Sequence, residues 1–410
     1  MTVLTIMAII IQLVIIFYSL YIFLFAFAGV FKKKKRIVPP DSAPRRKFAV
    51  LIPARNEESS IGQLLKSLQA QDYPSECYDV YVVADNCTDH TADVAWGFGT
   101  TPYERFNDVE MTKGYALEFL LDRVLEGGKT YDGFAIFDAD NIVDPDFLKE
   151  MNRAFANGCH VVQGQWQAKN PGENWLTRLN HASALLASLE QQGRLNLGLS
   201  CGLSGTSMAF SAEALQRLGG WKAYCLLEDL EMQARCVSKG LRVVWWPEAI
   251  SYDETTISMR QASNQRLRWV RGGIQVFLRY FSRLLVDGIK TLDLQKVEHY
   301  LWISRSLLPR SILIFVILCF MLFSLLGPLE AIFLPWPLWV LLTAGFLLCF
   351  LLGLAKHKAD WRSYFALLFS PAFVAIWLWA MTGNMFVRRL QWHKTSHAST
   401  VSAEDVLSDR

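Results

Sequence analysis

The stretch Gly133-Phe134-Ala135-Ile136-Phe137-Asp138-Ala139-Asp140 decides how this sequence folds. Its first five residues carry no charge and have the length of a buried strand. Two carboxylates follow at the carboxyl end of that strand, and ionised carboxylates are costly to bury unless they are paired or bind a cation. An oxygen-only pair suits Mg²⁺ or Mn²⁺. An exposed turn is the simpler alternative, because Asp is common in turns.

Predicted strands and helices alternate on both sides of this stretch. We expect buried strands at 48–52, 78–84 and 160–167, and helices at 113–125 and 145–156. This alternation predicts an α/β fold with a mostly parallel sheet that has helices on both faces. Ligands bind beyond the carboxyl ends of the strands in such sheets. We therefore expect three polar segments to meet on one rim: 53–58, 85–89 and 138–140.

The second half of the soluble part has a different pattern. It predicts strands at 204–210 and 242–246, a helix at 228–239, and a basic amphipathic helix at 258–285. In the last helix, apolar residues follow helical spacing and arginines, among them Arg266, lie between them. A core helix could show the same pattern. The density of arginine favours a helix that lies in a membrane interface.

Apolar residues make up 52% of the chain, and they are concentrated in long stretches. No charged residue occurs in 1–31, 311–329, 331–355 or 363–387. Each stretch is long enough to cross a bilayer, since about 20 apolar residues suffice. The last one has Ser370-Pro371 in its interior, and we expect it to be re-entrant or interfacial. A basic cluster, 32–36, follows the first stretch and predicts a cytoplasmic location for the soluble part, in a multi-pass protein of the inner membrane.

The expected organisation is an N-terminal transmembrane helix, an α/β domain, amphipathic interfacial helices, a membrane region of two or three segments, and a tail. Their ranges are 1–31, 47–255, 256–308, 309–387 and 388–410. A net charge of +3 is too small to indicate a nucleic-acid partner, and membrane lipid is the simpler partner of the basic residues. Eight scattered cysteines fit reduced thiols, and no zinc site is expected.

Seven motifs follow one another in a fixed order. They are PARNEE (53–58), VADNCTD (83–89), KGYAL (113–117), FDAD (137–140), LSGTSMAF (203–210), LLEDLEM (226–232) and QRLRW (265–269). Together they resemble the membrane-bound family 2 glycosyltransferases with a GT-A domain, such as bacterial exopolysaccharide, cellulose, chitin and hyaluronan synthases. The similarity extends from about Lys47 to Arg271. It implies transfer of a sugar from a nucleoside diphosphate, usually UDP, with inversion at the anomeric carbon.

The donor site is expected at the first four motifs. Asp85 can accept a hydrogen bond from a base imide, and the resemblance puts uracil there, near Pro53 and Glu57. Lys113 opens a helix, where a point charge and free N–H groups suit a diphosphate. The resemblance assigns the metal to Asp140, and it assigns Asp138 to the nucleotide and diphosphate with a second metal contact left open. An Asx turn at Asp85 and a solvated surface lysine are the alternatives.

The acceptor side is expected around Asp229, which we interpret as the general base. A positioned carboxylate of this kind contributes about 10²- to 10⁴-fold, and a single one fits inversion. Glu228 points elsewhere on the same helix. The alternative is that Glu228 and Asp229 only stabilise the N-terminus of a helix, since acidic residues favour the first turn.

The last motif offers groups for the acceptor and the diphosphate. Trp269 has a flat face for a sugar ring, and Arg268 and Gln265 share a helix face. Anchoring of Trp269 among lipid headgroups is the alternative. Gly205 and Thr206 are assigned near the acceptor by resemblance alone.

The sequence thus predicts an inner-membrane polysaccharide synthase that is processive, uses Mg²⁺ or Mn²⁺, and extends a glycan from a UDP-sugar. Its partners would be the donor, a glycan or lipid-linked acceptor, and an accessory export subunit or a second copy. Transfer of one sugar to a polyprenyl-phosphate carrier shares every motif and stays open. A nucleotidyltransferase and a non-enzymatic scaffold are further alternatives.

Overall fold

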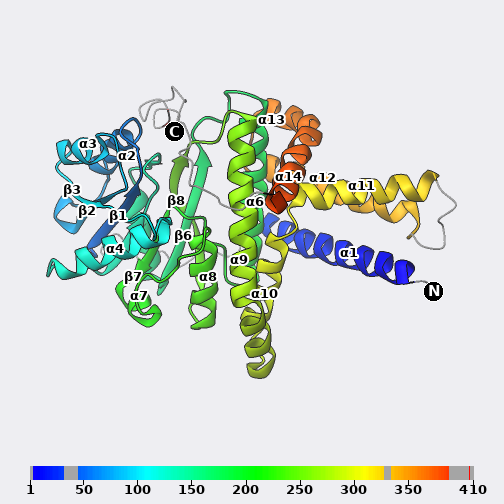
Figure 1. The fold of residues 1–410 in the computed structure, drawn as a ribbon, viewed down its shortest axis with the longest axis horizontal. Coiled ribbons are helices and arrows are strands. Elements are labelled where there is room, and N and C mark those ends of the chain that lie inside the picture. The colour runs from blue at the N-terminus through cyan, green and yellow to red at the C-terminus, as the bar shows by residue number, and fades with distance from the viewer. Residues whose placement is uncertain (1–2, 32–44, 327–333, 387–405, 407–410) are drawn as a thin grey trace.

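The computed structural model describes residues 3–31, 45–326, 334–386 and 406. An α/β domain lies at one end, and a group of apolar helices extends from it at the other (Figure 1). The basic cluster at 32–36 and the tail after 387, on which part of the topology prediction depends, lie outside the described residues.

One mixed sheet of eight strands runs through the α/β domain in the order β3-β2-β1-β4-β7-β6-β8-β5. The pairs β1–β2, β1–β4, β2–β3 and β6–β8 are parallel, whereas β7 and β5 pair with their neighbours in antiparallel fashion. The predicted α/β class is confirmed. The strands are β1 (Phe48–Ala54), β2 (Tyr78–Asp85), β3 (Thr101–Arg105), β4 (Gly133–Ile136), β5 (Ile142–Val143), β6 (Val161–Ala168), β7 (Met208–Ser211) and β8 (Val243–Asp253).

Helices cover both faces of the sheet, which is why the central strands are continuously apolar. Every residue of β1 is buried. One apolar core joins the sheet to α2 (Ile61–Gln69), α3 (Thr91–Gly97) and α5 (Phe147–Ala156). A second core joins the other face to α4 (Lys113–Glu126), α7 (Ala212–Leu218) and α8 (Glu228–Ser238). Strand β1 extends beyond the predicted end at residue 52 and continues through Pro53, whose partner is Val83.

Three long helices stand between the sheet and the apolar region (Figure 1). They are α6 (Trp175–Asn196), α9 (Met259–Thr291) and α10 (Leu294–Ser306). The sequence pattern predicts α9 but not α6. In α9, Arg266, one of the arginines between the apolar residues, is buried, whereas the apolar Leu278 is 65% exposed. The buried face of this helix is set by the helices that pack against it.

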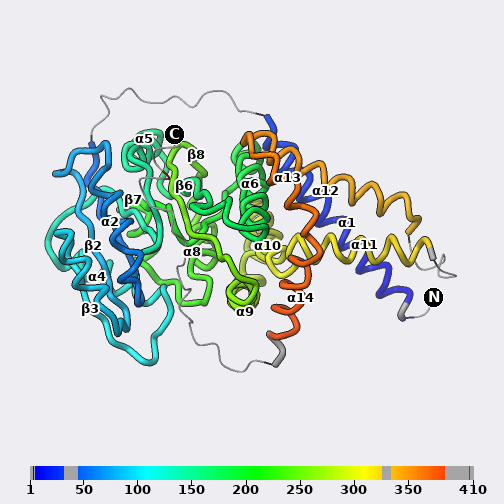
Figure 2. The backbone as a smooth tube through the Cα atoms, turned by 90° about the horizontal axis from the view of Figure 1, so that it is seen from above, coloured from blue at the N-terminus to red at the C-terminus, as the bar shows by residue number. Residues whose placement is uncertain are grey.

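The apolar region contains α1 (Val3–Val30), α11 (Arg310–Leu326), α12 (Trp336–Lys356), α13 (Trp361–Ala366) and α14 (Ser370–Phe386). Figure 2 shows α1, α11 and α12 reaching away from the sheet. Within the described residues, three segments are long and apolar enough to cross a membrane: Thr5–Val30, Trp336–Lys356 and Trp361–Gly383. Helices α10 and α11 form a fourth candidate that is bent by 72°.

A pair of glycines joins this region to the α/β domain. A Cβ atom added at Gly193 in α6 would lie 1.9 Å from the carbonyl oxygen of Phe25 in α1. One added at Gly29 in α1 would lie 1.9 Å from the carbonyl oxygen of Leu189. The two helix backbones therefore touch, and no side chain fits between them.

We expect Gly193→Ala to destabilise the protein, although alanine favours helices by up to about 1 kcal/mol over glycine. The added methyl group forces α1 away from α6, and overpacking of this kind costs about 1–3 kcal/mol. The measurement is the thermal midpoint of the purified protein in detergent. Gly383→Ala is the matched control, because a Cβ atom there meets nothing within 4 Å. Equal midpoints for the two variants would contradict the close contact.

Candidate active site

The amino group of Lys113 is the meeting point of three segments that are far apart in the sequence. Its Nζ atom lies 2.5 Å from Oδ1 of Asp138, 3.2 Å from Oε1 of Glu228 and 2.8 Å from the carbonyl oxygen of Gly205. Burial by itself would lower the pKa of this lysine, but the carboxylates of Asp138 and Glu228 raise it. Lys113 is therefore a permanent positive charge inside a ring of oxygen atoms.

The lysine is held there because the first turn of α4 packs directly on the loop before α8. A Cβ atom at Gly114 would lie 1.6 Å from the carbonyl oxygen of Ala223, so only glycine permits this contact. The next residue, Tyr115, stacks on Tyr224 with ring centroids 4.4 Å apart. The KGYAL motif thus supplies the charge and also the small residue and aromatic ring that position it.

Asp229 lies in the first turn of α8, next to this charge. A Cβ atom at Gly205 would lie 3.5 Å from Oδ2 of Asp229, and the N–H of Leu230 donates to Oδ1 at 2.7 Å. Burial, and then the neighbouring Glu228 carboxylate, raise the pKa of Asp229 to about 7, against the opposing effects of Leu230, Lys113 and Arg268. A carboxyl group with this pKa can take a proton near neutral pH.

Glu231 supports this turn, and the sequence analysis did not single it out. It is fully buried. Its Oε2 atom accepts hydrogen bonds from the backbone N–H groups of Tyr224 and Cys225 at 2.6 and 2.7 Å, and Oε1 lies 2.9 Å from Arg279 Nη1. These bonds fix the loop that leads into Glu228 and Asp229. Its position in the LLEDLEM motif, on the same helical turn as the two acids, was the available signal.

The turn that carries Gly205 and Thr206 is held by a second group that the sequence analysis missed. Gln163 in β6 accepts a hydrogen bond from the Ser204 N–H at 2.9 Å and donates to the Thr206 carbonyl at 2.9 Å. Gly205 has a φ of 79°, which favours glycine. The predicted strand at 204–210 begins only at Met208, because the residues before it form this turn.

The turn after β4 places Asp138 and Asp140 at the rim, both half-buried. The N–H of Asp138 donates to Asn141 Oδ1 at 3.1 Å and to Thr206 Oγ1 at 3.2 Å, and the Thr206 hydroxyl donates to Asn141. Within the described residues, no group of three or more acids, histidines or cysteines could hold a metal. The two carboxylates fit a hard cation only if phosphate oxygens and water complete its ligands.

The residues predicted to bind the base lie at the ends of β1 and β2. Asp85 is almost completely buried and accepts a hydrogen bond from Arg105 Nη1 at 2.7 Å. Burial raises the pKa of Asp85, and Arg105 opposes this shift. Glu57 accepts from the Ser60 hydroxyl at 2.5 Å, and Pro53 is buried in β1. One oxygen of Asp85 is thus engaged by Arg105, a partner that the sequence did not predict.

Helix α9 brings part of the QRLRW motif to the acids. A Cβ atom at Gly272 would lie 2.8 Å from the backbone nitrogen of Leu227, so α9 touches the start of α8. Arg268 is close enough to lower the pKa of Asp229. Trp269 packs toward α14, with its ring centroid 6.3 Å from that of Trp377. Gln265 accepts a hydrogen bond from Arg266 at 3.0 Å.

Several known proteins are similar to this chain in sequence. The probable glycosyltransferase YdaM of Bacillus subtilis is 28% identical over 58% of this chain and 57% of its own length. A beta-monoglucosyldiacylglycerol synthase of Synechocystis is 26% identical over 89% of this chain and 78% of its own length. A poly-beta-1,6-N-acetyl-D-glucosamine synthase of Staphylococcus epidermidis is 22% identical over 67% and 64%. The chain thus spans little more than half of some of these relatives.

Solved structures support the fold. A mannosyltransferase from Pyrobaculum calidifontis, solved in complex with GDP-Man and Mn²⁺, superposes with a TM-score of 0.57 at 17% identity, over 94% of this chain and 100% of its own. The expected GT-A fold class is confirmed. The model of the family described as "Glycosyltransferase like family 2" matches residues 44–272, more than half of the 410 residues. The chain belongs to glycosyltransferase family 2, whose members are enzymes that use nucleotide-sugar donors.

Proposed function

We propose that this enzyme transfers a sugar from a UDP-sugar, with inversion, to an acceptor at the cytoplasmic face of the inner membrane. The observation that carries the proposal is the cluster around Lys113, where Asp138, Glu228 and the turn at Gly205 meet beside Asp229. This cluster places the positive charge of Lys113, which suits a diphosphate, next to one carboxyl group, that of Asp229, whose pKa is raised to about 7.

In this mechanism Asp229 takes the proton of the acceptor hydroxyl as its oxygen attacks the anomeric carbon. The bond from that carbon to the diphosphate oxygen breaks, and UDP leaves with the bonding electrons. Lys113 faces the diphosphate side and offsets its negative charge, and Arg268 adds a second cation beside Asp229. Preorganised charges of this kind lower the barrier because they need no reorganisation during the reaction.

Asp140 and Asp138 would hold Mg²⁺ or Mn²⁺ together with the donor. The cation would supply charge neutralisation for the diphosphate leaving group. Asp138 has a second task, since its carboxylate is the closest anion to Lys113. The base would bind near Asp85 and Glu57, where Asp85 Oδ2 is not contacted by Arg105 and accepts a 3.4 Å hydrogen bond from Asn86.

Two acceptors remain in the proposal. A growing glycan is the first, because the QRLRW motif and the resemblance to polysaccharide synthases favour a processive enzyme. A membrane lipid that receives one sugar is the second. The wide match to a glucosyldiacylglycerol synthase, over 89% of this chain, favours it, since that match reaches beyond the sugar-transfer domain. Membership of a glycosyltransferase family disfavours the nucleotidyltransferase and scaffold alternatives.

We further propose that residues 47–255 form the catalytic domain, that 256–308 lie at the interface, and that the helices of 1–31 and 309–387 anchor them. The three long apolar helices support a multi-pass arrangement.

Replacement of the proposed base tests the mechanism directly. We expect Asp229→Asn to lower kcat by about 10²- to 10⁴-fold, because the acceptor hydroxyl loses its base. UDP binding, measured by calorimetry, should be retained. Asp287→Asn, near the C-terminal end of α9, is the control for general effects of removing a carboxylate. A fully active Asp229→Asn enzyme would end this assignment.

The raised pKa of Asp229 predicts that activity and stability change in opposite directions with pH. Because only the ionised form is a base, kcat/KM should fall about tenfold per pH unit below 7. The folded state favours the protonated form of Asp229. This preference stabilises the fold in full below about pH 3.8, the ordinary pKa of the group, and the contribution is lost as the pH rises to about 7. Asp229→Asn should therefore be at least as stable as the parent at pH 8. A pH-independent rate between pH 5 and 8 would contradict the prediction.

The product distinguishes the two acceptors. Purified enzyme should release UDP from one UDP-sugar in a screen, and excess EDTA should abolish this release until Mg²⁺ or Mn²⁺ is restored. Mass spectrometry of the product then shows either a ladder of added sugars or a single addition to diacylglycerol or polyprenyl phosphate. A single addition under all donor excesses would refute the processive proposal, and undiminished transfer in EDTA would refute the metal.

A further inference from the structure

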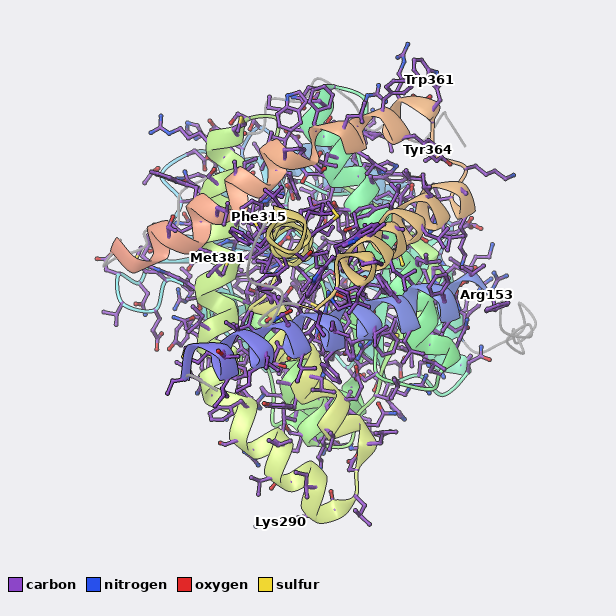
Figure 3. The ribbon with its side chains drawn as sticks, turned by 90° about the vertical axis from the view of Figure 1, so that its right-hand side faces the viewer. Arg153, Lys290, Phe315, Trp361, Tyr364 and Met381 are labelled. Carbon is purple, nitrogen blue, oxygen red and sulfur yellow. The ribbon has the colours of Figure 1, made fainter. Side chains whose placement is uncertain are left out.

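Helix α14 does not run alongside the other apolar helices. Figure 3 shows α11 end-on, near Phe315, with α14 lying across the view. Its 17 residues therefore cross the direction of α11 and reach α9, the helix of the QRLRW motif. An apolar cluster joins the three elements α6, α9 and α14, and it contains Leu176, Ala262, Phe373 and Ile376.

Arg266 lies in the middle of this contact and is only 3% exposed. Within the described part of the chain its hydrogen-bond acceptors are all neutral: Asn180 Oδ1 at 2.6 Å, Gln265 Oε1 at 3.0 Å and the Ala262 carbonyl at 3.3 Å. Its Nε atom is buried without a partner. Burial lowers the pKa of Arg266 to about 10, so the side chain stays charged at neutral pH.

Three aromatic rings take the place of a carboxylate. The guanidinium carbon of Arg266 lies 5.1 Å from the ring centroid of Trp269, 5.0 Å from that of Phe373 and 5.9 Å from that of Trp377. Ring faces attract a cation most strongly where water is excluded, as it is here. Two of the rings belong to α14 and one to α9, so a single cation joins the two helices.

The same cation fixes the orientation of Trp269. The indole ring contacts both the Arg266 guanidinium and the ring of Trp377, whose centroid is 6.3 Å away. Arg268, the residue before Trp269, lowers the pKa of Asp229. The same turn of α9 thus carries Arg268, which acts on the proposed base, and Trp269, which packs on α14, so a shift of α14 would move Trp269.

We propose that Arg266 is a positioning residue that clamps α14 onto α9 and thereby sets Trp269 for the acceptor. The inference rests on the proposed function, in which Trp269 contacts the acceptor. It assigns to α14 a part in acceptor binding through Trp377, in addition to anchoring. Donor binding at Lys113 and Asp138 should not depend on the clamp, because the described contacts of Arg266 include neither residue.

The first experiment separates acceptor from donor effects. Arg266→Met keeps much of the packing but removes the charge, and it should raise the acceptor KM about tenfold while the UDP-sugar KM and the rate of donor hydrolysis without acceptor stay within twofold. Arg266→Lys keeps a cation near the rings and should recover part of the loss. Arg260→Met, an exposed arginine on the same helix, is the matched control. Equal losses for donor and acceptor, or no rescue by lysine, would overturn the proposal.

The second experiment tests the partner on α14. Trp377→Phe and Trp377→Ala should raise the acceptor KM, and Arg266→Met combined with either should raise it no further than the worse single variant, because both act through one contact. Trp379→Ala is the control, since this tryptophan is 68% exposed on the same helix. Effects of Arg266→Met and Trp377→Phe that multiply independently would overturn the clamp.

A third readout does not need the transfer reaction. The thermal midpoints of the parent, Arg266→Met, Trp377→Phe and the double variant, in detergent and without substrate, should show the same non-additivity. If the parent transfers no sugar to any acceptor, the proposed function fails, and this readout still decides whether the clamp exists. Additive midpoint shifts would overturn it even if transfer is normal.

Discussion

The buried ion cluster at Lys113 is the interaction on which the rest of the site depends. One ammonium group satisfies Asp138 after β4, Glu228 at the start of α8 and the backbone at Gly205. Removing one partner of a buried charge cluster leaves the other charges uncompensated, which is strongly destabilising. The same groups face the proposed donor diphosphate. A bound donor would therefore contact the residues whose interactions hold the rim together.

Close backbone contacts turn this cluster into a rigid unit. Gly114 lets α4 touch the loop before α8, Gly272 lets α9 touch Leu227, and Gly193 lets α6 touch α1. None of these contacts tolerates a Cβ atom without movement. A displacement of α14 would therefore reach the start of α8 through α9, which gives the apolar helices a physical route to the acids.

The site also holds charges that do not favour folding. Asp229 is kept where burial and Glu228 penalise its ionised form, and Arg266 is buried without a carboxylate partner in the described structure. Such local costs are typical of functional sites and persist because the surrounding fold over-determines them. In both places the QRLRW motif contributes compensation: Arg268 for Asp229, and Trp269 for Arg266.

The sequence by itself determined the α/β class and the rim, because buried strands show as apolar runs and the polar residues that follow them must lie at the ligand edge of the sheet. It also singled out Lys113 and Asp229. It did not reveal Arg105, Glu231 or the burial of Arg266. Those depend on which helices pack together, and local periodicity does not encode the partner. Only the tertiary structure shows that Arg266, which was predicted for a polar face, lies among aromatic rings of α14. The physical reason is that α9 and α14 are about a hundred residues apart in the sequence and meet only through packing.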